Sequence, residues 1–131
     1  MDRVAGLENG IYRYLPVEHE LLAVRAPAEL NAMLEEACAQ SHVKNAAVVF
    51  AWTAIPYRME WRYGRASYKA IAVDAGHVCQ NLYLACEATG SAACAIGVYD
   101  QEKMDRILGV DGHDEFTVYM AAVGRRRHPG G

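Results

Sequence analysis

Short apolar runs, separated by turn residues, predict a chain in which strands and helices alternate. The runs 11–15 and 20–25 flank Pro16-Val-Glu-His19 and predict a β-hairpin with a four-residue loop. Three later runs lack a polar face, as expected of strands covered on both sides: 46–55, 93–99 and 116–123. The first of these is expected in the middle of the sheet. Helical spacing predicts helices over 27–38, 67–89 and 101–108, so the element order indicates an α+β sandwich with a mixed sheet.

The predicted helix 67–89 is apolar on nearly all sides, which is typical of a buried helix. Ser67 is suited to cap its start, and Gly90 is suited to end it in the left-handed conformation. Gly76 costs about 1 kcal/mol relative to alanine, which indicates that another backbone or a ligand approaches there. One short chain offers few partners for such a helix, so we expect it to pack against a second subunit in a symmetric homodimer.

A polar stripe on this helix is the most function-like feature of the residue pattern. Asp74, His77 and Asn81 follow one another at spacings of three and four, so they share one face of the helix. They could form a catalytic group. The alternative is a buried polar network in which these residues and Gln80 satisfy one another and tie the helix to a neighbouring loop.

Composition indicates a packed globular protein, because 53 % of the 131 residues are apolar and 22 % are charged. A chain of this length can form one core, so we expect a single domain over 1–131, with 1–9 and 125–131 mobile. The loop 57–66, rich in arginine and aromatic residues, follows the predicted central strand. Functional residues concentrate on such loops.

Net charge limits the classes of partner, and cysteine usage indicates the cellular compartment. The net charge of −3 predicts no general attraction to nucleic acid or to an anionic membrane. No signal peptide or membrane-spanning run is evident, so a soluble protein is expected. The four cysteines form no CxxC pair, which favours free thiols and a cytoplasmic location.

Metal binding and cysteine chemistry find little support. His77 and Cys79 point about 200° apart on a helix, so they are not expected to share an ion or to form a nucleophilic pair. The chain also lacks a Gly-x-Ser-x-Gly elbow, a Walker loop and a GxGxxG fingerprint.

A set of motifs extends in order over nearly the whole chain. The motifs are Gly10-Ile-Tyr-Arg-Tyr-Leu-Pro-Val-Glu-His-Glu-Leu21, Tyr63-Gly-Arg-Ala-Ser-Tyr68, Asp74-Ala-Gly-His-Val-Cys-Gln-Asn-Leu-Tyr-Leu84, Ala95-Ile-Gly-Val-Tyr-Asp100, Leu108-Gly-Val-Asp111 and Glu115-Phe-Thr-Val-Tyr-Met-Ala-Ala-Val-Gly124. Together they resemble the SagB-type branch of the nitroreductase superfamily.

The resemblance implies an FMN-dependent oxidoreductase with the flavin ring at a dimer interface, acting on a small molecule or a modified peptide. The branch includes enzymes that oxidise azoline rings in ribosomally made peptides. By this likeness, Tyr63 matches a tyrosine assigned to substrate proton transfer. Arg62 stands where azoline oxidases carry a lysine, and arginine effectively cannot lose its proton to act as a base.

The resemblance also implies the cofactor-binding residues. The backbone of Ala95, Ile96, Gly97 and Val98 would approach the reactive edge of the flavin, where Gly97 presents no side chain. After the last strand, basic residues would lie near the FMN phosphate, to which guanidinium groups bind well; these are Arg125, Arg126 and Arg127. The alternative for them is a solvated chain end.

The likeness starts where a family member would be nearly half over, so the domain is expected to be a shortened one. The earlier Arg/Ser-rich helix that grips the FMN phosphate in that family has no counterpart in this sequence. A separate subunit could supply it, or the remaining half could bind FMN differently. The alternative function is a non-catalytic scaffold or partner subunit that has lost part of the flavin site.

Overall fold

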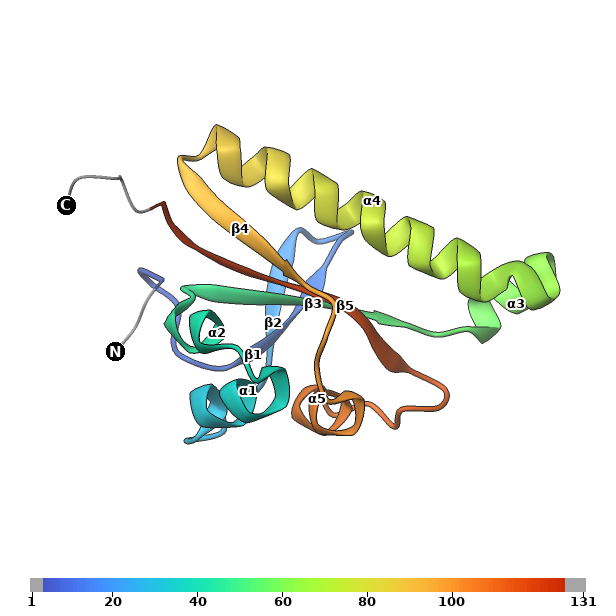
Figure 1. The fold of residues 1–131 in the computed structure, drawn as a ribbon, viewed down its shortest axis with the longest axis horizontal. Coiled ribbons are helices and arrows are strands. Elements are labelled where there is room, and N and C mark those ends of the chain that lie inside the picture. Colours follow the sequence, from blue (N-terminus) through green and yellow to red (C-terminus); the bar gives the residue numbers. More distant parts are fainter. Residues whose placement is uncertain (1–3, 127–131) are drawn as a thin grey trace.

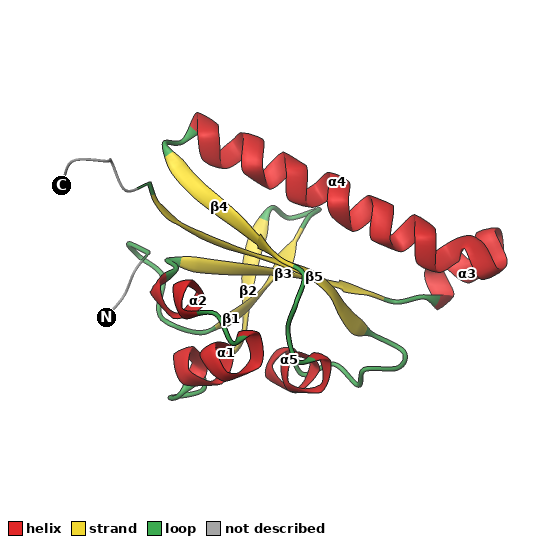
Figure 2. Ribbon diagram, in the orientation of Figure 1, coloured by secondary structure: helices red, strands yellow, loops and turns green. Residues whose placement is uncertain are grey.

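The computed structural model describes residues 4–126, which form a three-stranded sheet between two helical layers and a separate two-stranded hairpin (Figure 1). Helix α4 covers one face of the sheet, and α1, α2 and α5 cover the other, as Figure 2 shows. The elements are β1 (Ile11–Leu15), β2 (Glu20–Arg25), α1 (Leu30–Cys38), α2 (Ser41–Asn45), β3 (Val48–Ala54), α3 (Tyr57–Tyr63), a 3₁₀ turn (Gly64–Ala66), α4 (Ser67–Ala88), β4 (Ser91–Ile96), α5 (Gln101–Leu108) and β5 (Phe116–Arg125). The predicted α+β class is confirmed.

The strand order β3-β5-β4 places the last strand in the centre of the sheet. Strands β3 and β4 both pair antiparallel with β5, and β1 pairs antiparallel with β2. A mixed sheet was expected, whereas each strand pair in residues 4–126 is antiparallel. The prediction that 46–55 is central is wrong: β3 is an edge strand of the described sheet, and Phe50 is 41 % exposed. An apolar run indicates that both faces of a strand are covered. It does not indicate whether the strand has hydrogen-bonded neighbours on one side or on both sides.

The main core lies between the sheet and the layer of α1, α2 and α5. The central strand of the sheet, β5, contributes Met120 to this core, and Met120 is fully buried. The other buried members come from the three helices and from β4 and β5: Leu30, Ala37, Cys38, Val43, Ile96, Met104, Ile107 and Ala122. Burial raises the pKa of the Cys38 thiol, so this cysteine is an inert core residue.

A buried carboxylate joins α5 to β5. Asp105 is 4 % exposed, and its Oδ1 accepts hydrogen bonds of 2.7 Å from both the backbone N–H and the hydroxyl of Thr117. Gln101 donates to both carboxylate oxygens, at 3.1 and 3.0 Å. Tyr99 donates to the Thr117 carbonyl, and burial together with the Asp105 charge raises the pKa of Tyr99 to about 12.

The register of β3 against β5 shifts between Trp52 and Thr53, and such a bulge redirects the side chains that follow it.

Helix α4 is less buried than its sequence predicts. Only Ser67, Ile71, Cys79 and Cys86 are buried along its length. The apolar side chains on its other sides remain exposed within residues 4–126, and Leu84 is 61 % exposed. The prediction of a fully buried helix is therefore wrong for the chain by itself, while the expected dimer stays a prediction.

The polar stripe on α4 is not a buried network. The side chains of Asp74, His77, Gln80 and Asn81 are exposed, and none of them makes a hydrogen bond within the described part of the chain. They share a face, as their spacing predicts, but that face points away from the sheet. The hypothesis that they satisfy one another and order a neighbouring loop is wrong for residues 4–126.

The segment before α4 also differs from its prediction. The expected loop 57–66 is largely helical, because α3 follows directly on Pro56, whose φ of −54° suits a helix start. Ser67 does not cap α4: it is the first helical residue, and its fully buried hydroxyl has no hydrogen-bond partner. Gly90 does adopt the left-handed conformation, with φ of +69°.

No helix in residues 4–126 has the length and apolar character needed to cross a membrane.

Replacing Gly76 by alanine is expected to raise the free energy of unfolding of the isolated chain by about 1 kcal/mol, because alanine is the better helix former. A Cβ at this position meets no atom within 4 Å, so the chain itself does not require glycine there. Urea unfolding measures the change. A loss of stability would contradict the open surroundings, whereas weaker self-association in gel filtration would place Gly76 at a subunit contact.

Candidate flavin-edge site

The end of β4 presents an exposed stretch of backbone. Ala95 and Ile96 close the strand, and Gly97 and Val98 continue beyond it without regular structure. Val98 is 79 % exposed, and neither it nor Gly97 forms a backbone hydrogen bond within the described residues. Two N–H groups here are therefore free to donate to a ligand.

Helix α4 supports this strand from its outer edge. The Ala95 N–H, which points away from β5, donates to the Tyr83 hydroxyl at 2.8 Å. A Cβ placed on Gly97 would contact only Tyr119, at 3.7 Å from its ring carbon Cε2. The chain itself therefore leaves room for a side chain at Gly97, so packing within the chain does not explain the glycine.

The side chains of Tyr83, Tyr119 and Cys79 lie beneath this backbone, and we refer to them as the floor of the site. Tyr119 on β5 and the Cys79 thiol on α4 influence each other's pKa, and the Tyr119 ring lies 6.1 Å from that of Trp52. Burial raises the pKa of the Cys79 thiol, and the Tyr119 hydroxyl lowers it in part. Burial and the neighbouring Cys79 and Tyr83 raise the pKa of Tyr119. Both groups are therefore protonated near neutral pH, and the floor carries no charge.

Arg62 and Tyr63 lie on α3, next to each other. The Arg62 guanidinium lies 5.4 Å from the centroid of the Tyr63 ring, within reach of a cation–π contact. Tyr63 is half exposed and is the last residue of α3, followed by Gly64 with φ of +50°. Both side chains are thus accessible, but α3 lies beyond the N-terminal end of α4, apart from the main part of the sheet (Figure 1).

The basic residues after β5 are only partly described. Arg125 is the last residue of β5. Arg126 pairs with Glu87 on α4, which already neutralises its charge. Arg127 lies outside the described residues.

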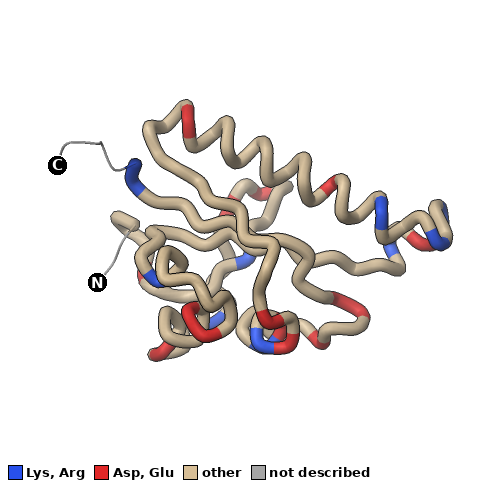
Figure 3. The backbone as a smooth tube through the Cα atoms, in the orientation of Figure 1, with Lys and Arg blue, Asp and Glu red and all other residues tan. Residues whose placement is uncertain are grey.

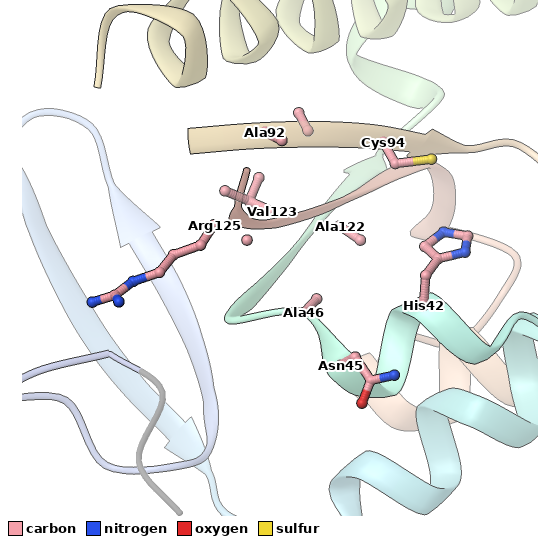
Figure 4. Close-up of a pocket in the computed structure, with 10 residues that line it drawn as sticks. His42, Asn45, Ala46, Ala92, Cys94, Ala122, Val123 and Arg125 are labelled. Carbon is pink, nitrogen blue, oxygen red and sulfur yellow. The ribbon is translucent and has the colours of Figure 1, made fainter. Parts of the chain in front are cut away.

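Arg125 borders a shallow hollow of about 170 Å³ between α2 and the sheet (Figure 4). His42 and Asn45 line it from α2, and Cys94 lines it from β4. In Figure 4 the Arg125 side chain extends away from His42 and Cys94. The sequence did not single out His42 and Asn45, because α2 has only five residues and no apolar period marks it.

The predicted site residues occupy three separate places in the chain. In the β4–β5 ladder, Arg125 pairs with Ser91 and Met120 pairs with Ile96. Arg125 and Gly97 therefore lie at opposite ends of β4, about 20 Å apart at 3.3 Å per residue. The structure brings together Ala95–Val98 with Tyr83 and Tyr119, and it leaves Arg62, Tyr63 and Arg125 apart from them.

Comparisons with known proteins agree with this fold. A model of the nitroreductase family matches residues 3–125. The Methanocaldococcus jannaschii protein MJ1384, named as a nitroreductase, is 25 % identical over 123 residues, which are 94 % of this chain and 61 % of its own. A solved structure named as a nitroreductase, from Anabaena variabilis, has a TM-score of 0.84 at 30 % identity, over 94 % of this chain and 25 % of that chain.

A more distant likeness shows the fold alone. The E. coli microcin synthetase McbBCD complex, with truncated pro-MccB17 bound, contains a chain with a TM-score of 0.73 at 15 % identity. The alignment covers 89 % of this chain and 44 % of that one. This chain thus spans about three fifths of the M. jannaschii relative and a quarter of the Anabaena chain. Because the family model covers nearly all of its residues, the chain belongs to the nitroreductase family.

Proposed function

We propose that the protein is an FMN-dependent oxidoreductase of the SagB-type branch, acting on a small molecule or a modified peptide. The observation that carries the proposal is the exposed backbone at Ala95–Val98, where a glycine that packing does not require stands beside free N–H groups. A planar heteroaromatic ring fits such a surface, since it needs a close approach and hydrogen-bond donors. A protein of similar fold from Staphylococcus epidermidis, at 16 % identity, is named as an NAD(P)H:FMN oxidoreductase.

When bound, FMN would supply the capacity to accept or donate a hydride. The residues of this chain would orient it: Gly97 and Val98 through their N–H groups, with the uncharged floor of Tyr83 and Tyr119 beneath. Tyr63 would exchange a proton with the substrate, and Arg62 would fix an anionic group of the substrate without acting as a base. Arg125, Arg126 and Arg127 are proposed to contact the phosphate.

A flavin pocket assembled from more than one chain accounts for the spacing of these groups. Arg125 and Gly97 lie at opposite ends of β4, and the apolar side of α4 away from the sheet is uncovered. We therefore propose a homodimer or a complex with a separate subunit that supplies the groups missing beside Ala95–Val98. The coverage of the relatives leaves room for such a segment.

Absorption spectroscopy tests the flavin proposal. The purified protein is expected to be yellow or to take up added FMN, and to release FMN on denaturation. A colourless protein that does not bind FMN, alone or with its co-purified partners, would exclude this function and favour the non-catalytic scaffold.

Replacing Tyr63 by phenylalanine is expected to lower turnover about 100-fold without loss of bound flavin, because general acid–base groups contribute on this scale. Tyr57→Phe on the same helix is the matched control, since Tyr57 is 78 % exposed and is given no part in proton transfer or flavin binding. Steady-state kinetics gives the turnover of each variant, and flavin content is measured in parallel on the same samples. Equal turnover in the two variants would remove Tyr63 from the mechanism.

A further inference from the structure

The chain carries an unneutralised positive surface, although its net charge is −3. Residues 57–73 hold four cations and a single carboxylate, Glu60. Figure 3 shows the basic positions gathered at α3 and at the start of α4. None of these cations enters an ion pair within residues 4–126. We define the basic face as Arg58, Arg62, Arg65 and Lys69, together with Tyr57 and Trp61.

The geometry of α3 presents the charges and the aromatic rings side by side. Arg58 and Arg62 are four residues apart and share one side of the helix, and Tyr57 and Trp61 are four apart on the adjoining side. Tyr57 is 78 % exposed and Trp61 is 75 % exposed. The Trp61 indole donates to the Arg58 carbonyl at 2.9 Å, which fixes the ring on the helix surface.

The start of α4 adds further positive potential. Its first turn contains Lys69 and no acidic residue. A cation at this end opposes the helix dipole, where a carboxylate would be stabilising by about 0.3–1 kcal/mol. With Arg65 immediately before the helix, the local charge pattern is unfavourable for the isolated chain and favourable for an anionic partner.

The composition and extent of the basic face point to a polypeptide partner. Tryptophan, tyrosine and arginine are the residues enriched at protein–protein hot spots. The seven residues of α3 alone extend over about 10 Å, so one small anion could not contact all four cations. A peptide carboxylate matches the fork of an arginine, and an apolar peptide side chain matches the exposed rings.

We propose that the basic face is a docking surface for an acidic polypeptide segment, whose carboxylates bind Arg58, Arg62, Arg65 and Lys69 and whose aromatic or apolar side chains pack on Tyr57 and Trp61. This surface is distinct from the flavin edge at Ala95–Val98 and shares only Arg62 with the proposed substrate contact, so the variants used to test it leave Arg62 unchanged. Its occupation is measured as binding, so the outcome does not depend on the flavin content of the sample.

Fluorescence anisotropy with a labelled peptide of repeated Asp-Phe-Ser-Glu tests the docking surface. The wild-type chain is expected to bind this peptide, and not its Asn/Gln counterpart, and to lose affinity as salt is raised. The double variant Arg58→Glu, Arg65→Glu is expected to bind about tenfold more weakly or worse, because like charges then face each other. Glutamate and arginine have similar helix propensity, so the fold should persist, which circular dichroism checks.

Arg106→Glu is the matched control, because Arg106 is exposed and lies on α5, outside the basic face. It should bind the peptide as the wild type does. Three results would overturn the proposal: no binding by the wild type, equal loss in the Arg106→Glu control, or equally tight binding of oligothymidylate. Conversion of a dimer to a monomer by the double variant would also overturn it, since a second copy of the chain would then cover the face.

Discussion

Replacing Asp105 by alanine is expected to lower the free energy of unfolding by about 3 kcal/mol, since several buried donors lose their acceptor together. The Thr117 N–H and hydroxyl both donate to Asp105 at 2.7 Å, and Gln101 donates to both of its oxygens. The change also removes the hydrogen bonds that join α5 to the central strand. Urea denaturation with a fixed m-value measures the loss.

Asp114, an aspartate on the surface between α5 and β5, provides the comparison. The Asp114 side chain is 85 % exposed, so Asp114→Ala should change the free energy of unfolding by less than about 0.5 kcal/mol. Asp105→Asn should fall between the two, because it keeps an oxygen for Thr117 while its amide group meets the Gln101 amide. If Asp105→Ala proved as mild as Asp114→Ala, the network would have no role in stability.

Replacing Gly97 by valine is expected to weaken FMN binding at least about tenfold while leaving the fold intact. The added side chain would occupy the surface on which the flavin edge is proposed to rest, and loss of close approach is costly to affinity. Within the chain, the new Cβ meets only the Tyr119 ring at an ordinary contact distance of 3.7 Å. Flavin titration monitored by fluorescence, with a thermal unfolding curve for each protein, measures both quantities.

Gly97→Ala provides a graded control, since it adds one methyl group at the same position. Affinity should fall in the order glycine, alanine, valine, with little change in thermal stability. Unchanged FMN affinity in Gly97→Val would move the flavin edge away from Ala95–Val98.

Local signals in the sequence predicted most of the elements but missed the short helices α2 and α3. The hairpin follows from two apolar runs around Pro16-Val-Glu-His19, and β1 and β2 confirm it. Helix α5 occupies the predicted range 101–108, with the Asp100 side chain accepting from the Lys103 N–H and Gly109 in the left-handed conformation. Cap residues and periodicity are local, so the sequence displays them directly.

Arrangement in space was harder to predict. The apolar pattern of β3 and β5 is similar, yet one is an edge strand and the other is central in the described sheet. The α4 pattern predicts burial on nearly all sides, but the described chain covers only one of them. Neighbours in a sheet, and partners outside the chain, depend on contacts distant in sequence that periodicity does not record.

The candidate site shows the same limit. Gly97 stood out through the family resemblance, whereas the bond of Tyr83 to Ala95 and the proximity of Tyr119 to Gly97 emerge only when α4 and β5 are in place. The separation of Arg125 from Gly97 follows from the antiparallel register, which the residues alone do not specify. Arg58 and Lys69 were visible as charges, but their lack of carboxylate partners required the structure.

The position of β5 in the sheet has a consequence for synthesis on the ribosome. Strands β3 and β4 bond to β5 and not to each other, so neither has its partner until residues 116–125 emerge. Roughly sixty residues separate β3 from β5, which at about 5–20 residues per second is several seconds of translation. During that interval two apolar strand edges remain open to wrong pairing. Wrong pairing is thus a hazard of the nascent chain that ends only when its central strand is made.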